Sequence, residues 1–153
     1  MPARFFAAAL AVLAVVGCSS AKTPALTGFG ASRAVFTAHR GPEYSSIVTD
    51  GAGRVQSYIL TTPPRTLAQA QAAVERDLPP DATASPPQAV VGIEQTKCEI
   101  VEFTSPTLRR VFGGDHGGQV MVVFEAENAI VMDTDRIVSA TVVSGVENLP
   151  RQC

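Results

Sequence analysis

The sequence lacks the residues and motifs on which most enzymes depend. It has 153 residues, no tryptophan and only two histidines, His39 and His116. A metal site or a Ser-His-acid triad that needs an imidazole would have to use one of these two. No P-loop, dinucleotide fingerprint, G-x-S-x-G or H-E-x-x-H motif occurs. We therefore expect a protein that is not an enzyme, with no cofactor and no metal ion.

Excess charge of either sign is also lacking. The chain has 12 Lys and Arg against 14 Asp and Glu, with a formal net charge of −2. The only adjacent basic pair is Arg109-Arg110. Proteins that bind nucleic acid carry clustered basic residues, so the composition argues against a nucleic-acid partner.

The longest apolar run lies at the N-terminus. Arg4 precedes an unbroken apolar segment at residues 5–16, and Gly17-Cys18 follows it. A membrane-spanning helix needs about 20 such residues, so this segment is too short to span a bilayer. A basic residue, a short apolar segment and small residues at its end are typical of a secretory signal. The pattern therefore predicts export.

The last residues of this signal, Val15-Val16-Gly17-Cys18, resemble the lipobox of bacterial lipoproteins. The resemblance implies that residues 1–17 are removed and that Cys18 becomes a diacylglycerol-modified N-terminus. Two or three acyl chains hold a protein durably on a membrane. The alternative is an ordinary signal peptide, but Val15 fits its small-x-small cleavage pattern poorly. We expect lipid anchoring through Cys18 on the extracytoplasmic face of the cell membrane.

The chain has three cysteines, and a lipid on Cys18 would leave Cys98 and Cys153. Two cysteines outside the cytoplasm have one possible intramolecular pairing. A disulfide that closes about 55 residues could stabilise the fold by about 4 kcal/mol in the chain-entropy model. A redox-active pair is the alternative, but the C-x-x-C motif it would need is absent. We expect a structural disulfide between Cys98 and Cys153.

Residues 18–32 are small and polar, with proline and glycine interruptions. Such a segment cannot bury enough apolar surface to order itself, which predicts a lipidated cysteine followed by a flexible tether. No repeat or second change of composition follows. We expect a single extracytoplasmic domain at residues 33–153.

The hydrophobic pattern of this domain predicts an α+β fold. A helix is expected from Thr66, where Thr66 and Gln69 form a capping box, to Pro79-Pro80. Its apolar face is Leu67, Ala70, Val74 and Leu78. Ser105-Pro106 opens a short helix that Gly113 ends. Strands are expected at 34–38, 46–49, 54–60, 90–103, 119–126 and 137–143, with an irregular connector at 79–89.

These elements predict an antiparallel sheet of about four to six strands, with one main helix packed on one face. The other face is expected to be partly covered or available to a partner.

The glycine-rich segment 113–118 contains Asp115 and His116. An imidazole beside a carboxylate on exposed backbone is one candidate for a ligand-binding site. The alternative, which we favour, is a turn whose glycines supply positive φ and whose Asp115 and His116 are only solvated.

The rest of the chain resembles small uncharacterised lipoproteins of mycobacteria and their relatives. The resemblance rests on Leu-Pro-Pro-Asp at 78–81, a mid-chain Cys98 and Phe-x-Ser-Pro-x-Leu at 103–108. It implies no activity and no catalytic residue.

Three functional hypotheses follow. The first is a non-catalytic accessory or protein-interaction module of the cell envelope, with an envelope protein as its partner. The second is a carrier lipoprotein that binds a small ligand or a lipid in an apolar pocket. The third, which we favour least, is a hydrolase that uses His116 with Asp115.

Overall fold

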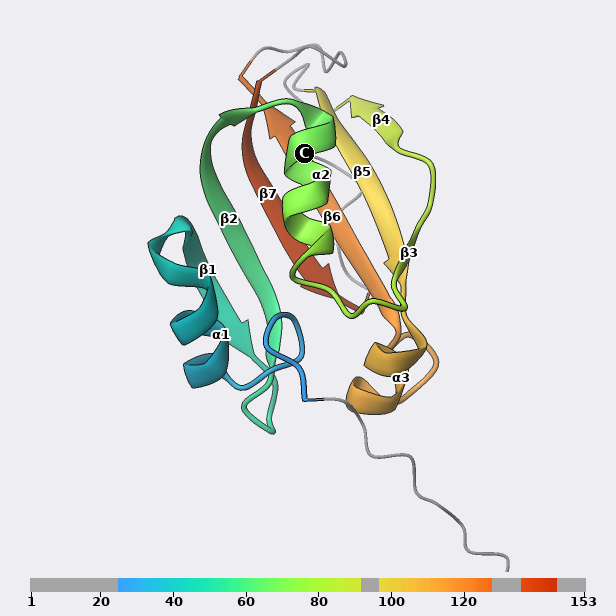
Figure 1. Ribbon diagram of the computed structural model, residues 1–153. Helices are drawn as coiled ribbons and strands as arrows, with labels where there is room; N and C mark the ends of the chain where they lie inside the picture. The colour runs from blue at the N-terminus through green and yellow to red at the C-terminus, as the bar shows by residue number, and fades with distance from the viewer. Residues whose placement is uncertain (1–24, 92–96, 128–135, 146–153) are drawn as a thin grey trace, which may run out of the picture.

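A computed structural model describes residues 25–91, 97–127 and 136–145 of the chain. Over these residues the chain forms an α+β domain, with three α-helices and a seven-stranded sheet in which every pairing is antiparallel (Figure 1). The predicted class is confirmed, and the sheet has more strands than the four to six expected. No helix of the described part is long and apolar enough to cross a membrane.

The strands follow an order in which the last two of the sequence lie at the centre. Side by side lie β1 (Tyr44–Thr49), β2 (Val55–Arg65), β7 (Ile137–Ser144), β6 (Gln119–Ala126), β5 (Lys97–Thr104) and β3 (Thr83–Ala84). Strand β4 (Gln88–Val91) also pairs with β5. The additional strands β3 and β4 lie largely in the segment expected to be an irregular connector. They are short and lie at the edge of the sheet, where the neighbouring prolines are tolerated.

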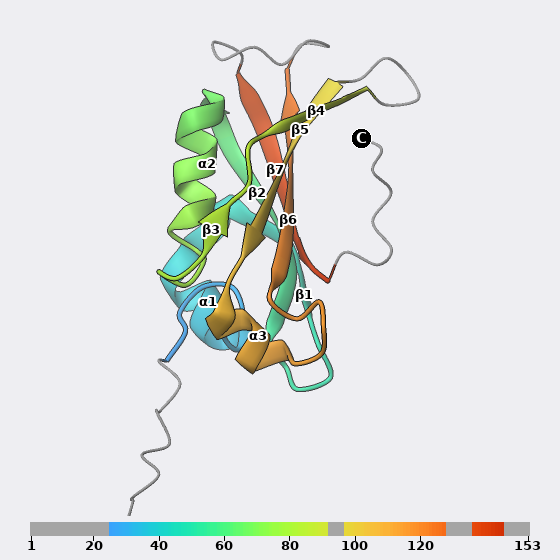
Figure 2. The same ribbon diagram turned by 90° about the vertical axis from the view of Figure 1, so that its right-hand side faces the viewer.

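The helices are α1 (Arg33–Arg40), α2 (Leu67–Glu75) and α3 (Pro106–Phe112). Figure 2 views the sheet nearly edge-on and shows α1 and α2 on the same side of it, with α3 at its lower end. The sheet therefore has one face under a helical layer and a second face over which no described helix lies.

The start of α2 is built as the sequence predicts. Thr66 accepts a hydrogen bond from the Gln69 amide, and the Gln69 side chain accepts one from the Thr66 amide. The helix ends at Glu75, earlier than expected, but the predicted apolar face is buried: Leu67, Ala70, Val74 and Leu78. The short helix is also confirmed, with Ser105 as its N-cap and Gly113 at its C-terminal end.

The strand expected at 34–38 is wrong, because this segment forms helix α1. The Ser32 side chain accepts a hydrogen bond from the Val35 amide and so caps a helix. Gly41 ends that helix at a φ of 74°, which a glycine adopts without strain. The hydrophobic pattern of five residues is compatible with either a helix or a strand. Here the capping residues Ser32 and Gly41 favour the helix.

The folded domain begins before residue 33, where the tether was expected to end. Phe29 is fully buried, and its amide donates to the Asp77 carbonyl over 2.8 Å. A Cβ atom on Gly28 would lie 2.0 Å from the same carbonyl oxygen, so only glycine allows this close approach. The last residues of the expected tether are therefore part of the packed domain.

The core lies between the helical layer and the sheet. Val120, Val122 and Phe124 of β6 are fully buried on the helical side, as their alternation predicts. Phe36 of α1 packs in the same core, and the centroid of its ring lies 5.0 Å from that of the Tyr58 ring. The core thus joins α1 to the centre of the sheet.

We predict that Phe36→Ala lowers the free energy of unfolding by about 3–5 kcal/mol, because it leaves a cavity in a packed core. Val35→Ala is the matched control on the same helix, since Val35 is 37% exposed, and we expect a change of at most about 0.5 kcal/mol. Urea unfolding followed by circular dichroism measures both. Equal losses for the two variants would show that α1 does not anchor the core through Phe36.

Candidate functional site

The surface of the sheet that faces away from α1 and α2 is termed here the second face. Its side chains alternate along the strands with those of the core, and the strand pairing aligns them in rows. Four strands contribute: Ser57, Ile59 and Thr61 of β2; Ser139, Thr141 and Val143 of β7; Met121, Val123 and Glu125 of β6; and Cys98, Ile100 and Glu102 of β5.

The half of the second face on β5 and β6 forms a small apolar cluster. Cys98, Ile100 and Met121 are 1%, 8% and 4% exposed, and Val90 and Val123 pack against them. Beside the cluster lies a hollow of about 50 Å³, which Ile100 and Met121 help to line. We term these five residues the β5–β6 cluster.

Cys98 is disulfide-bonded, and it is the only cysteine among the described residues. Cys18 and Cys153 both lie outside the described part of the chain. The lipid on Cys18 and the pairing of Cys98 with Cys153 therefore stay predictions.

The half of the second face on β2 and β7 is more open. Ile59, Thr141 and Val143 are half-buried, and Thr61 is exposed. At its border the Ser139 hydroxyl donates to Glu125 Oε2 over 2.9 Å. This half thus presents two apolar side chains among hydroxyl groups. We term it the β2–β7 half.

Asp115 and His116 lie where the sequence placed them, in the exposed loop between α3 and β6. His116 Nδ1 lies 2.9 Å from Oε1 of Gln119. The loop borders an open hollow of about 510 Å³ that Ser144 also lines. Gly113 and Gly114 have φ near +70°, as the solvated-turn interpretation requires. Ligand binding at Asp115 and His116 stays a prediction.

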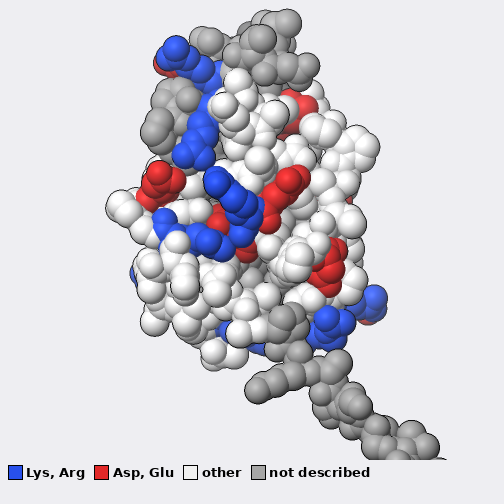
Figure 3. All heavy atoms as spheres, viewed as in Figure 1, with Lys and Arg blue, Asp and Glu red and all other residues white. Residues whose placement is uncertain are grey.

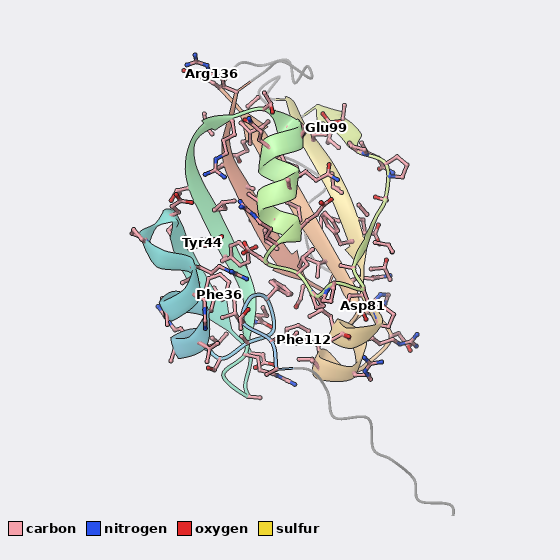
Figure 4. All side chains as sticks on the ribbon, viewed as in Figure 1. Phe36, Tyr44, Asp81, Glu99, Phe112 and Arg136 are labelled. Carbon is pink, nitrogen blue, oxygen red and sulfur yellow. The ribbon has the colours of Figure 1, made fainter. Side chains whose placement is uncertain are left out.

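The sequence did not reveal a buried polar cluster around Asp77. The hydroxyls of Tyr58 and Tyr44 donate to Asp77 Oδ2 over 2.8 and 2.9 Å. Arg40 Nε lies 2.7 Å from Asp77 Oδ1, although the angle there is not that of a hydrogen bond. Figure 4 shows Tyr44 beside Phe36 at the junction of α1 with the sheet. The cluster ties the end of α2 to α1, β1 and β2.

Burial dominates the electrostatics of this cluster. It raises the pKa of the Asp77 carboxyl, although hydrogen bonds from the two tyrosines and the charge of Arg40 act in the opposite direction. Burial next to the Asp77 carboxylate also raises the pKa of Tyr44 and of Tyr58. All three groups therefore have a structural explanation. Asp77 and Arg40 help to line a hollow of about 130 Å³, which is smaller than the ligand pockets of about 300 Å³ and more found in proteins.

One signal in the sequence could have indicated this cluster. Asp77 follows the last turn of α2, where the helix macrodipole disfavours a carboxylate. An acidic residue at such a position needs a partner elsewhere in the fold.

A second aspartate, Asp81, holds α3. Its carboxylate accepts hydrogen bonds from the Ser105 hydroxyl and from both the amide and the hydroxyl of Thr107. Figure 4 shows Asp81 beside the start of α3. Burial acts to raise the pKa of Asp81, but these hydrogen bonds outweigh it and lower the pKa. This carboxylate caps a helix, which is a structural role.

The helical side of the molecule carries mixed charge. Arg65, Arg76 and Glu75 help to line an open groove of about 700 Å³. Figure 3 shows basic and acidic groups interspersed on this side. No group of three or more metal-ligating side chains occurs within the described ranges. The groove therefore has no dominant charge that would select an ionic ligand.

We predict that Asp77→Asn lowers the free energy of unfolding by about 1–3 kcal/mol, because it replaces one carboxyl oxygen by an NH2 group, which cannot accept the hydrogen bonds that the hydroxyls of Tyr44 and Tyr58 donate to Asp77. Since folding raises the pKa of Asp77 above its ordinary value of 3.8, the folded state binds more protons than the unfolded state between these two values. The wild-type stability that depends on Asp77 is therefore full at lower pH and falls as the pH rises through this window.

Urea unfolding of wild type and Asp77→Asn between pH 4 and 7 measures the difference. We expect it to shrink as the pH rises, and a difference that grows would contradict the raised pKa. Asp115→Asn, at an exposed position, is the control and should change stability by at most about 0.5 kcal/mol.

Comparisons with protein-family models, with curated proteins and with solved structures found no match to this chain. The function must therefore be argued from the geometry and chemistry of its own surfaces. Of these surfaces, the β2–β7 half of the second face is one that the helical layer does not cover and that is only partly buried.

Proposed function

We propose that the chain is a lipid-anchored, non-catalytic protein-interaction module on the extracytoplasmic face of the cell membrane. In this proposal, the β2–β7 half of the second face contacts an envelope protein. The main supporting observation is that α1 and α2 cover only one face of the sheet. The β2–β7 half of the other face is therefore only partly buried, although β7 is a central strand.

The chemistry of the β2–β7 half suits a protein partner. Ile59 and Val143 supply apolar contact area, and the hydroxyls of Ser57, Thr61 and Thr141 can exchange hydrogen bonds with a partner. Reversible protein interfaces mix apolar and polar surface in this way. Charged groups are costly to remove from water, and this half has none within it.

The free edge of β1 supports the proposal less well. A partner strand could in principle pair with an edge strand. In β1, however, Ser46 has a φ of 50° and the pairing register shifts between Ser45 and Val48. Such irregular edges disfavour the addition of a strand.

The carrier hypothesis has less support than the interaction module. Ligand pockets generally have volumes of about 300–1,000 Å³ and apolar linings. The hollow beside the β5–β6 cluster has only about 50 Å³, and Ser85, Gln88 and Glu102 supply polar groups to its lining. The hollows of about 700 and 510 Å³ are open, and the first is lined largely by charged residues and the second mainly by glycines.

The position of the first described residues supports the proposed anchoring. The described chain begins at the end of the sheet where α3 lies (Figure 1), and Phe29 packs against Phe112 of α3 with ring centroids 5.8 Å apart. Cys18 precedes Ala25 by seven residues, which reach at most about 25 Å. A lipid on Cys18 would keep this end of the domain near the bilayer. The second face would then point sideways, where a neighbouring envelope protein can reach it.

We predict that Cys18→Ala, or globomycin treatment of cells with the wild-type chain, blocks cleavage of the signal. Thioether lipidation must precede cleavage in the lipoprotein class that the lipobox resembles. Intact mass and metabolic labelling with a fatty-acid analogue measure the outcome. A mature wild-type N-terminus without acyl groups would contradict the anchoring proposal. Cys98→Ala is the control and should leave cleavage and labelling unchanged.

We predict that a photo-crosslinking amino acid at Thr141 captures one defined envelope protein in living cells. The same probe at Ala68, which is exposed on α2, should not capture it. The substitution Val143→Glu, next to the probe, should abolish the adduct, because it places a charge in the apolar part of the contact.

Val35→Glu on α1 is the matched control for that substitution and should leave the adduct intact. Adducts formed equally from Thr141 and Ala68, or insensitive to Val143→Glu, would contradict the use of the β2–β7 half.

A further inference from the structure

The end of the domain that carries α3 is joined together by one arginine. Ser32, directly before α1, pairs with Arg54, directly before β2, in an isolated antiparallel bridge. The Arg54 guanidinium lies over the ring of Phe112, 5.3 Å from its centroid, and donates a hydrogen bond to the Val111 carbonyl. These contacts bring the start of α1, the turn at 50–54 and residues 106–118 to the same end of the domain. We term it the α3 end.

Four arginines lie at the α3 end. Arg33 is the first residue of α1, Arg109 and Arg110 are in the last turn of α3, and all three are exposed. The fourth, Arg54, is half-buried and forms an ion pair with Asp50, with 2.7 Å between Nη2 and Oδ2. Within the described ranges the three exposed arginines form no such ion pair.

The acidic side chains of this end do not balance the arginines. Asp50 is paired with Arg54, and the half-buried Asp81 carboxylate accepts three hydrogen bonds from the start of α3. Arg110 helps to lower the pKa of Asp81 but forms no salt bridge with it. Asp115 is the remaining exposed carboxylate. Three exposed arginines therefore face one exposed aspartate, and Figure 3 shows basic side chains at this lower end of the molecule.

The last turn of α3 also presents apolar surface beside its arginines. Val111 and Phe112 are half-buried, whereas Leu108 of the preceding turn is fully buried in the core. Helices that lie on a membrane surface combine basic and partly exposed apolar side chains in this way. The α3 end therefore has the chemistry of a surface that faces lipid headgroups.

The proposed lipid anchor would hold this same end close to the bilayer. A Cβ atom on Gly30 would lie 2.9 Å from Leu26 Cδ1 and 3.3 Å from Leu108 Cδ2, so the first described residues run beside α3. Cys18 precedes Ala25 by seven residues, which reach at most about 25 Å. Because charges are screened beyond about 8 Å at physiological ionic strength, this short connection matters for any attraction between the arginines and the membrane.

We propose that the α3 end rests on the bilayer surface, where Arg33, Arg109 and Arg110 bind the anionic headgroups of phospholipids. The proposal rests on the lipid anchoring proposed above, and it adds an orientation of the domain to that anchoring. Each arginine near an anionic membrane surface raises the ratio of docked to undocked domain about fivefold. Three of them are enough to select one orientation of a domain that the anchor already keeps nearby.

This orientation determines which neighbours can reach the β2–β7 half. Strands β2 and β7 extend away from the α3 end (Figure 1). With the α3 end on the bilayer, the second face stands upright on the membrane. The β2–β7 half would then face proteins that project from the same membrane surface.

Nuclear magnetic resonance of the acylated protein in lipid nanodiscs tests the orientation. The discs contain a gadolinium-chelating lipid and either phosphatidylcholine alone or equal amounts of phosphatidylcholine and phosphatidylglycerol. Paramagnetic relaxation of the amide protons measures their proximity to the headgroups. We expect the relaxation enhancement at Val111 and Phe112 to rise about threefold or more with phosphatidylglycerol, and high ionic strength to remove this rise. The amide of Ala68, in the first turn of α2 at the opposite end of the sheet, should not respond.

The double substitution Arg109→Glu and Arg110→Glu should remove the rise at Phe112. Arg136→Glu is the matched control and should preserve it, because Arg136 is exposed and lies at the opposite end of the domain from Phe112 (Figure 4). Circular dichroism confirms that the variants are folded, and the effect of ionic strength on the wild type does not depend on their folding.

The two proposals fail in different ways in this experiment. Equal enhancement in the two kinds of disc, or a rise that survives the double substitution or high ionic strength, would overturn the docking of the α3 end and leave the anchoring intact. An intact mass without acyl groups on the mature N-terminus would contradict the anchoring and, with it, the docking.

Discussion

The structure depends on one constraint, which is that a seven-stranded sheet has two faces and the described helices cover only one of them. Apolar side chains on the other face must be hidden by another part of the chain, contact a partner, or alternate with polar groups. The second face combines these solutions. Its β5–β6 half is buried, and its β2–β7 half places Ile59 and Val143 among hydroxyl groups.

The helical layer is held by polar as well as apolar contacts. The Asp77 carboxylate accepts hydrogen bonds from the hydroxyls of Tyr44 and Tyr58 and lies beside the guanidinium of Arg40. One carboxylate therefore links the end of α2 to α1 and to the first two strands. The aromatic rings of Phe36, Tyr44 and Tyr58 pack around it at centroid distances of 5.0 to 5.3 Å. Because these polar groups are one another's interaction partners, the cluster has a structural role in the fold. This leaves the second face as the surface with unexplained chemistry.

The sequence predicts those parts of the fold that local chemistry determines. The capping box of Thr66 and Gln69, and the alternation of Val120 and Phe124, act over a few residues and are confirmed. The expected strand at 34–38 is wrong because the Ser32 cap outweighs a short pattern. Asp77 was not identified because Tyr58 and Tyr44 are 19 and 33 residues away in the sequence. The division of the second face into two halves can be predicted only when the strand order is known, and no local sequence pattern gives that order.

Methyl nuclear magnetic resonance spectra of the protein, with and without detergent-solubilised envelope proteins, test the central claim most directly, namely that a partner binds the β2–β7 half of the second face. The account predicts that the methyl signals of Ile59 and Val143 shift or broaden on addition, while those of Val35 on α1 do not. Unchanged signals of Ile59 and Val143, or changes confined to Val35, would contradict it.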